Sequence, residues 1–229
     1  MNAASSGARP AVTVKLATSL DGRIATASGE SRWITGEAAR EQGHRLRAEH
    51  DAVLVGSGTA TTDDPELTVR LDPPPARQPV RMVVDSRGAL GPNAKLFRTL
   101  DKGPVVIATR EDTDLDAAGW PERDGVQYWM LPPEEPEGSV SLTAFLDMAG
   151  EAGIRSVLVE GGGRIAAAFV RAGLVDRLEW FRAPILLGAE GRPCMGDLGL
   201  EKLAEAPQFK RTSSQTLGPD AWDSFQRAD

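Results

Sequence analysis

Short apolar runs that alternate with amphipathic helical segments constrain the fold of this chain more than any other feature. Residues 12–18 alternate apolar and polar side chains, and four continuous runs are bounded by Gly, Pro or Asp, at 52–56, 80–84, 104–108 and 156–159. Such runs are typical of strands buried on both faces. Apolar spacing of three and four residues predicts helices over 142–149 and 165–172. A helix over 37–47 is predicted by Thr35 as a cap, an acidic residue in the first turn and arginines in the last. The alternation indicates an α/β fold with a largely parallel sheet.

The texture of the chain changes after Asp176. Residues 177–184, 208–217 and 221–227 read as longer strands without intervening helices, and we expect them to close the same sheet in antiparallel fashion. Residues 71–79 contain four prolines and residues 131–138 are rich in Pro and Glu, so both are predicted surface loops. Neither is long enough for a linker. We therefore expect a flexible segment at residues 1–10 and one domain over residues 11–229.

Composition excludes several classes of protein. The net charge of −7 argues against nucleic acid as the main partner, because binding to phosphate backbones requires a basic surface. Cys194 is the one cysteine, which rules out an internal disulfide and a thiolate metal site and favours a structural role for this thiol. The N-terminus has no apolar segment of signal-peptide type, and no run approaches the ~20 residues of a membrane span. We expect a soluble, cytoplasmic protein without a metal.

A glycine turn follows the strand predicted at 156–159. Glu160 and the three glycines 161–163 lead into a helix, where bare backbone N–H groups are suited to a dinucleotide pyrophosphate. A tight strand-to-helix connection is the alternative, since neither a Walker A loop nor the Gly-x-Gly-x-x-Gly spacing is present. The Glu160 carboxylate either caps the turn or binds a hydroxyl-rich ligand.

Basic side chains from separate segments form a candidate phosphate site. Arg47 lies in the last turn of the first predicted helix, on one face with Arg40 and His44, and Arg70 ends the segment 63–70. Two arginines bind a phosphate monoester well, whereas the alternative is a solvated basic face.

Three further features of the sequence allow more than one interpretation. Asp63 and Asp64 precede Pro65, and turn formation or capping is the expected role of at least one of them. Trp33 either stacks on a flat ring or belongs to the core. Trp180 and Phe181 are either core residues or part of a dimer interface.

Six ordered segments resemble the reductase domain of the bacterial bifunctional riboflavin-biosynthesis deaminase/reductase, over residues 11 to about 225. These are VKLATSLDGR at 14–23, SGESRWIT at 28–35, DDPELTVR at 63–70, VEGG at 159–162, APILLG at 183–188 and GLEKL at 199–203. The resemblance implies a dihydrofolate-reductase-like fold, with a mixed, mostly parallel sheet flanked by helices and antiparallel C-terminal strands. It also implies a homodimer, NADPH as hydride donor, and 5-amino-6-(5-phosphoribosylamino)uracil as the phosphorylated small-molecule substrate.

The resemblance also assigns the site residue by residue. Its cofactor contacts fall on Ala17, Trp33, Thr59, Asp63, Ser86, Gly162, Gly163, Arg164, Ile165, Ala166, Ala167 and Ala168. Its substrate contacts fall on Ser31, Arg47, Leu67, Arg70 and Glu160. Lys15 matches a lysine of the family and is expected, with Glu160, to serve in catalysis. For the 2′-phosphate of the cofactor we expect Ser86, Arg87 or Arg110, which lie at or just beyond predicted strand ends.

Two alternatives to this function stay open. The same fold serves a reductase of a pterin-like or other carbonyl substrate, or a nucleotide-binding protein without turnover. With a single cysteine, the chain lacks the zinc-deaminase signature of the bifunctional proteins, so a separate deaminase is expected to supply the substrate.

Overall fold

The computed structural model describes residues 9–134 and 138–228, so residues 1–8 of the predicted N-terminal segment lie outside the described part. Contacts between residues divide the chain into two compact units. The first comprises Met1–Ala11 and Arg47–Leu158, and the second comprises Val12–Leu46 and Val159–Asp229. The chain passes between the units three times, of which two fall within α1 (Glu37–Glu49) and β9 (Ser156–Glu160).

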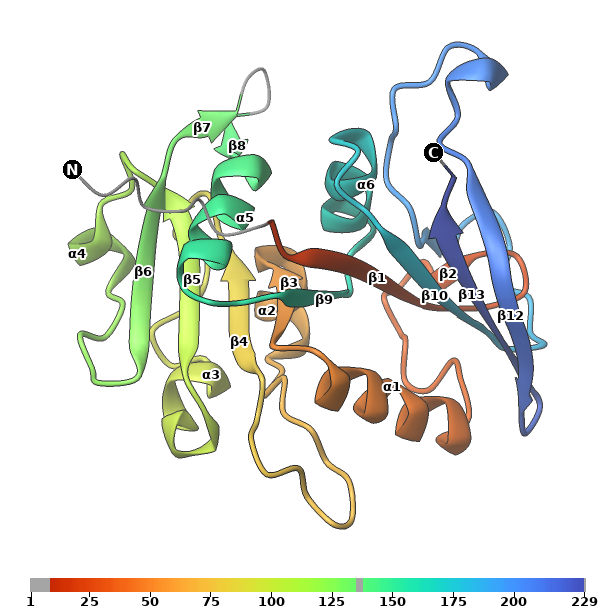
Figure 1. Ribbon diagram of the computed structural model, residues 1–229, viewed down its shortest axis with the longest axis horizontal. Coiled ribbons are helices and arrows are strands. Elements are labelled where there is room, and N and C mark those ends of the chain that lie inside the picture. Colours follow the sequence, from red (N-terminus) through yellow and green to blue (C-terminus); the bar gives the residue numbers. More distant parts are fainter. Residues whose placement is uncertain (1–8, 135–137, 229) are drawn as a thin grey trace. The chain divides into compact units, whose positions relative to one another are not determined.

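In the first unit, four strands pair in parallel in chain order (Figure 1). These are β3 (Ala52–Gly56), β4 (Val80–Val84), β5 (Val105–Arg110) and β6 (Val126–Leu131). The helices are α2 (Ser57–Asp63), α3 (Lys95–Arg98), α4 (Leu115–Ala118) and α5 (Leu142–Glu151), with a 3-10 turn η1 (Leu100–Lys102). A small hairpin is formed by β7 (Pro133–Glu134) and β8 (Ser139–Val140).

Alternate residues of these strands point to opposite faces, as the two-residue period of a strand requires. One face packs against α2 and α3 through a buried cluster that includes Val53, Val83, Ile107 and Phe97. On β6, Trp129 and the α5 residue Phe145 contact each other, with ring centroids 5.7 Å apart. Both faces are therefore covered, which explains why these strands are continuous apolar runs.

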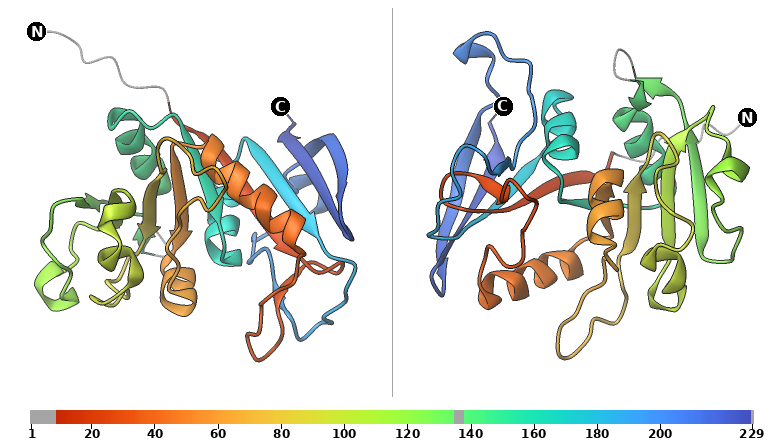
Figure 2. Two further views of the ribbon diagram at one scale, coloured as in Figure 1. Left: turned by 90° about the horizontal axis from the view of Figure 1, so that it is seen from below. Right: turned by 180° about the vertical axis from the view of Figure 1, so that it is seen from behind.

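In the second unit, β1 (Ala11–Thr18) pairs in parallel with β10 (Arg177–Arg182). β10 pairs antiparallel with β13 (Asp220–Arg227), and β13 with β12 (Phe209–Leu217). The helices α1 and α6 (Gly163–Arg171) lie on opposite sides of β1 and β10 (Figures 1 and 2). A short antiparallel pair joins β2 (Arg23–Ala25) to β11 (Arg192–Pro193), and η2 (Leu203–Glu205) is a 3-10 turn.

The predicted fold class is confirmed, since the pairing is mostly parallel and the C-terminal strands are antiparallel. Phe181 is fully buried and stacks on Trp222 at 5.5 Å, so it belongs to the core. The predicted loop at 71–79 contains no helix or strand.

Two parts of the chain differ from the sequence interpretation. β6 was not expected, because its half-exposed residues interrupt the apolar pattern of a strand with only one partner. The predicted loop at 131–138 contains the end of β6 and β7, one strand of the β7–β8 hairpin. Such a short hairpin is held by backbone hydrogen bonds and needs no apolar pattern. Residues 135–137 lie outside the described part.

Candidate functional site

The segment at residues 64–70 carries two of the predicted substrate residues, Leu67 and Arg70. It leaves α2 through Asp64, whose φ of 40° is left-handed, and Leu67 has a φ of 57°. Leu67 is buried while Arg70 is exposed. The Asp64 carboxylate accepts the backbone N–H of Lys95 at 2.7 Å, which joins this segment to the start of α3.

Arg47 reaches this same segment from the end of α1. Its Nη1 donates a hydrogen bond of 2.8 Å to the carbonyl oxygen of Thr68, two residues before Arg70. The structure thus brings the Arg47 side chain to the loop that carries Leu67 and Arg70, although these residues come from separate parts of the sequence. Gln78 holds the loop from another direction, accepting the N–H of Val69 at 2.7 Å and donating to its carbonyl at 3.0 Å.

The predicted cofactor residues of the first unit lie at the carboxyl ends of its parallel strands. Thr59 and Asp63 belong to α2, which follows β3, and Ser86 follows β4. Thr59 is half-buried and Asp63 is exposed. The Ser86 hydroxyl oxygen accepts the backbone N–H of Val140 at 2.9 Å. Ligands of α/β proteins bind at this edge of the sheet.

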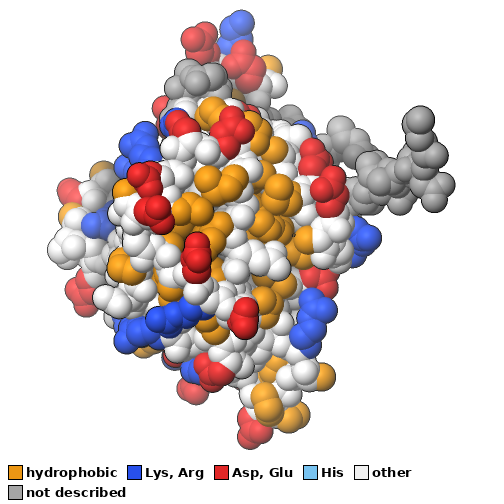
Figure 3. Space-filling model, turned by 90° about the vertical axis from the view of Figure 1, so that its left-hand side faces the viewer, with side chains coloured by type: hydrophobic (Ala, Val, Ile, Leu, Met, Phe, Trp, Pro, Cys, Tyr) orange, Lys and Arg blue, Asp and Glu red, His pale blue; other side chains and the backbone are white. Residues whose placement is uncertain are grey.

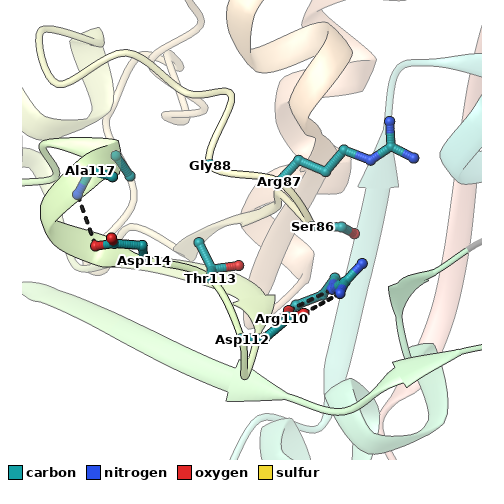
Figure 4. Close-up of a pocket in the computed structure, with 9 residues that line it drawn as sticks. Ser86, Arg87, Gly88, Arg110, Asp112, Thr113, Asp114 and Ala117 are labelled. Carbon is teal, nitrogen blue, oxygen red and sulfur yellow. Dashed lines mark hydrogen bonds and ion pairs between the residues drawn. The ribbon is translucent and has the colours of Figure 1, made fainter.

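A pocket of about 400 Å³ opens between the turns that follow β4 and β5. Figure 4 shows Ser86, Arg87 and Gly88 from one turn, and Arg110, Asp112 and Thr113 from the other, with Ala117 of α4 beside them. The three residues that we expected near the 2′-phosphate, Ser86, Arg87 and Arg110, therefore line one pocket.

The two arginines of this pocket differ in their partners. Arg110 forms a two-pronged ion pair with Asp112, in which Nε donates to the carboxylate at 2.7 Å, and its Nη1 donates to Gly138 at 3.1 Å. The Arg110 guanidinium lowers the pKa of Asp112 below its ordinary value. Arg87 is exposed and has no hydrogen-bond partner within the described residues. Arg87 is thus the guanidinium that an added anion contacts without competition from a carboxylate.

The predicted glycine turn is present in the second unit. Gly161 and Gly162 have φ values of 82° and 78°, and Gly162 is the N-cap of α6 without a side-chain cap. Glu160 ends β9 directly before this turn and is 8% exposed. The conformation explains the first two glycines, because residues with a Cβ are strained at positive φ.

The remainder of the predicted cofactor segment is packed against protein. A Cβ on Gly163 would lie 2.8 Å from the carbonyl oxygen of Pro193, and the Gly163 carbonyl accepts the N–H of Gly196. Within the first two turns of α6, buried side chains belong to Ile165, Ala166 and Ala167. Their side chains are turned into the protein, and the N–H of Ala166 donates to the carbonyl oxygen of Gly162, whereas Arg164 is exposed.

Lys15 and Ala17 share one side of β1 and are both half-buried, between fully buried neighbours. The Lys15 ammonium lies 5.7 Å from the centroid of the Phe181 ring. A Cβ on Gly43 of α1 would lie 3.7 Å from the Lys15 ammonium, so the absence of a side chain at Gly43 leaves room beside it. The Lys15 side chain therefore lies between β1 and α1 without being sealed from solvent.

Trp33 is 67% exposed, so of the two interpretations of this ring the core is excluded. The Arg40 guanidinium lies 4.7 Å from its centroid and donates to the carbonyl oxygen of Thr35 at 2.8 Å. Arg40 thus supports the Trp33 ring, and its predicted partnership with Arg47 on a phosphate-binding face has no support in these contacts. Ser31 lies half-buried in the same loop.

Sequence reasoning missed three residues that hold the loops of these sites. Arg81 and Gln78 hold the loop at 64–70, and Asp21 accepts the N–H groups of Leu187 and Gly188 at 3.1 and 2.8 Å. A hydrogen bond from Ser19 and these backbone bonds lower the pKa of Asp21 to about 2. The signal for Arg81 was visible, since a guanidinium inside the apolar run at 80–84 requires internal acceptors.

Other ligand classes find little support in the described residues. No group of three or more His, Cys, Asp or Glu side chains within the described ranges is arranged to hold a metal ion. No helix among them has the length and hydropathy of a membrane-spanning segment. Burial raises the pKa of the Cys194 thiol, in accord with a structural role.

The comparisons with known proteins agree on one family. The model of the RibD C-terminal domain matches residues 10–222. The riboflavin biosynthesis protein RibD of Escherichia coli (strain K12) is 40% identical over 222 residues, covering 92% of this chain and 58% of that protein. The chain therefore spans a little over half the length of this relative.

Two solved structures relate the fold to known enzymes. One is a diaminohydroxyphosphoribosylaminopyrimidine deaminase/5-amino-6-(5-phosphoribosylamino)uracil reductase from Thermotoga maritima. It is 30% identical with a TM-score of 0.77, and the match covers 96% of this chain and 57% of that one. Dihydrofolate reductase from Enterococcus faecalis, solved with NADP(H), shares the fold alone at 10% identity and a TM-score of 0.51, over 96% and 97% of the two chains. This chain belongs to the RibD C-terminal domain family and has the dihydrofolate-reductase-like fold.

Proposed function

We propose that this protein uses NADPH to reduce the ribosyl group of 5-amino-6-(5-phosphoribosylamino)uracil to the ribitylamino product of riboflavin biosynthesis. Membership of the RibD C-terminal domain family supports this reaction, as does the reductase activity named for the Thermotoga relative. The observation that carries it is the hydrogen bond from Arg47 to Thr68, which brings a second guanidinium to the loop of Arg70. A phosphorylated sugar is the ligand that such a pair recognises.

The glycine turn fits the pyrophosphate of a dinucleotide. Gly161 and Gly162 hold positive φ values, and α6 begins without a side-chain acceptor at its N-cap, so its first N–H groups suit an anion. Here Gly162, Gly163 and Arg164 are the residues that we propose to hold the pyrophosphate. We propose that Ala17, Trp33, Thr59 and Asp63 complete the cofactor contacts.

The pocket at Ser86, Arg87 and Arg110 supports NADPH rather than NADH. A serine hydroxyl and an arginine without a competing carboxylate are a suitable donor set for a 2′-phosphate. Arg110, held by Asp112, adds positive charge with a smaller share of free donors. We propose that Ser86 and Arg87 make the main contacts with this phosphate.

The substrate is assigned to Ser31, Leu67, Glu160 and the two arginines. We propose that Arg47 and Arg70 bind its 5′-phosphate, while the buried Glu160 carboxylate accepts hydrogen bonds from ribose hydroxyls. The hydrogen bond from Arg47 Nη1 to Thr68 places the Arg47 guanidinium beside the loop of Arg70.

Opening of the ribosyl ring yields an imine, and its reduction adds hydride to carbon and a proton to nitrogen. When bound, the reduced nicotinamide supplies the hydride at C4. We propose that Lys15 donates the proton to the nitrogen, since its ammonium lies between β1 and α1 with room beside Gly43. Glu160 orients the sugar chain, and the arginines position the reacting carbon through the remote phosphate.

The test is NADPH oxidation with freshly deaminated pathway intermediate, with the ribitylamino product identified by mass. Turnover of this substrate and not of dihydropterins or simple aldehydes is the expected result. Turnover of a pterin or aldehyde instead would assign another substrate, and NADPH binding without oxidation of it by any of these compounds would identify a nucleotide-binding protein.

We further propose that a separate deaminase supplies the substrate and that the protein is a homodimer. The face around β6, shown in Figure 3, supports dimerisation because hydrophobic side chains gather there between charged ones. Within the described residues, β6 pairs with β5 along one edge and its other edge is unpaired. Light scattering coupled to size exclusion should give twice the chain mass, and a monomer at micromolar concentration would contradict this.

A further inference from the structure

Arg81 is a fully buried arginine in the centre of the first unit. It lies on β4 between Val80 and Met82, and its exposed fraction is 0%. Burial of the guanidinium lowers its pKa below the ordinary arginine value. A buried charge is retained only where hydrogen bonds replace the lost water.

The acceptors of the Arg81 guanidinium hydrogen bonds lie in two loops. Nη1 donates to the Thr99 hydroxyl at 2.8 Å and to the carbonyl oxygen of Glu66 at 3.3 Å. Nη2 donates to the carbonyl oxygen of Thr99 at 2.8 Å and to that of Gly103. The guanidinium therefore joins residues 99–103, between α3 and β5, to the residue directly before Leu67.

The loop at 64–70 needs such support. Two of its residues, Asp64 and Leu67, have left-handed backbone conformations that non-glycine residues rarely adopt. Besides Arg81, the residues that contact this loop include Arg47 and Gln78, Lys95 and Arg98 at Asp64, and Lys102, whose ammonium lies 2.9 Å from the Glu66 carboxylate. The Lys102 side chain is 44% exposed, whereas Arg81 is in the core.

We propose that Arg81 is a positioning residue, which sets the conformation of the loop at 64–70 and thereby the placement of Leu67 and Arg70 for the phosphorylated substrate. The inference rests on the proposed function for its catalytic consequence, while the link between Arg81 and the loop is independent of it. Lysine is not an equivalent at this position, because a single ammonium cannot span the acceptors of two loops.

The test compares Arg81→Lys with Lys102→Met, which removes an exposed contact with the same Glu66. Hydrogen exchange and kinetics are measured below the unfolding temperature of each variant. In Arg81→Lys the amides of residues 66–69 should exchange about tenfold faster or more, and KM for the phosphorylated substrate should rise about tenfold with kcat changed less. NADPH affinity should stay at the wild-type value. Lys102→Met should leave exchange and KM nearly unchanged, since exposed ion pairs contribute little.

Gln78→Leu provides a second variant if Arg81→Lys does not fold. It removes another hold on the same loop at Val69, and it should also accelerate exchange at 66–69 and raise KM. Wild-type exchange at 66–69 in a less stable Arg81→Lys protein would overturn the proposal and leave Arg81 as a purely structural residue. If the proposed function is wrong, the wild-type protein will not turn over the substrate, yet the exchange data will still decide whether Arg81 sets the loop.

Discussion

Arg47 and Arg70 are the residues on which the choice of substrate depends. A charge-assisted hydrogen bond from each to the 5′-phosphate contributes on the order of 1.5–3 kcal/mol. Arg70→Ala should therefore lower kcat/KM by roughly ten- to a hundredfold with NADPH affinity unchanged. Arg47→Ala should also destabilise the fold by about 1 kcal/mol, because it leaves the Thr68 carbonyl without its donor.

The control for this prediction is the dephosphorylated substrate. Wild type should turn it over poorly, and neither arginine variant should lose much further activity on it, because the group that the guanidinium binds is absent. Steady-state kinetics on both substrates check this. Equal losses on the two substrates would mean that these arginines act through the fold and not on a phosphate.

The preference for NADPH is set, on our proposal, by the charges of the pocket at Ser86. Arg87→Gln should lower the affinity for NADPH about three- to tenfold and leave the affinity for NADH nearly unchanged. The effect is moderate because a solvent-exposed guanidinium contributes less binding free energy than a buried one. Asp112→Asn should raise the affinity for NADPH, because it removes a carboxylate and releases Arg110 from its ion pair. Fluorescence titration of both nucleotides measures these changes.

Asp116→Asn is the matched control, since this residue is an acid of α4 that does not line the pocket. It changes the net charge by the same amount as Asp112→Asn. If the two variants raise the affinity for NADPH equally, the effect comes from the overall charge and the pocket is not the site of the 2′-phosphate.

At the scale of elements, the turn between β9 and α6 is the part on which cofactor binding depends under the proposed function. Gly162 has a φ of 78°, so Gly162→Val combines a strained conformation with bulk where the pyrophosphate is proposed to lie. NADPH binding should fall below detection in a protein that still folds. Calorimetric titration and circular dichroism check the two halves of this statement.

Gly163→Ala tests how tightly the same turn packs against residues 193–196. Its Cβ would lie 2.8 Å from the Pro193 carbonyl oxygen, so the expected effect is a lower melting temperature. If Gly162→Val binds NADPH normally, the pyrophosphate site lies elsewhere, whatever the stability of the Gly163→Ala variant.

At the scale of the whole molecule, Asp21 makes the free energy of unfolding depend on pH in the acidic range. Its pKa is lowered from 3.8 to about 2 by the hydrogen bond from Ser19 and those from Leu187 and Gly188. A carboxylate whose pKa is lower in the folded state than in the unfolded state stabilises the fold at pH values above its unfolded-state pKa. This contribution is lost as the pH falls from about 3.8 towards 2. Asp21→Asn should therefore be less stable at neutral pH and show a smaller further loss over that window. Denaturant unfolding at several pH values measures the difference, and parallel pH profiles would contradict it.

Local pattern was sufficient for much of this protein. The apolar runs at 52–56, 80–84 and 156–159 predict β3, β4 and β9, because strands covered on both faces are predominantly apolar. The glycine turn predicts the start of α6, because positive φ is inexpensive only without a Cβ. The six ordered motifs together predict the family of the chain from the sequence alone.

Tertiary structure alone decided which distant residues meet. The partners of Arg81 lie 15 to 22 residues away in the chain, and Gln78 completes a backbone pairing for Val69 across a loop. The partnership of Arg47 with Thr68 and the pocket shared by Ser86, Arg87 and Arg110 are likewise products of folding. Periodicity reports which side of an element is buried, but a hydrogen bond between loops depends on where the whole chain brings their ends. That is why the elements were predictable from the sequence and the residues that hold the loops were not.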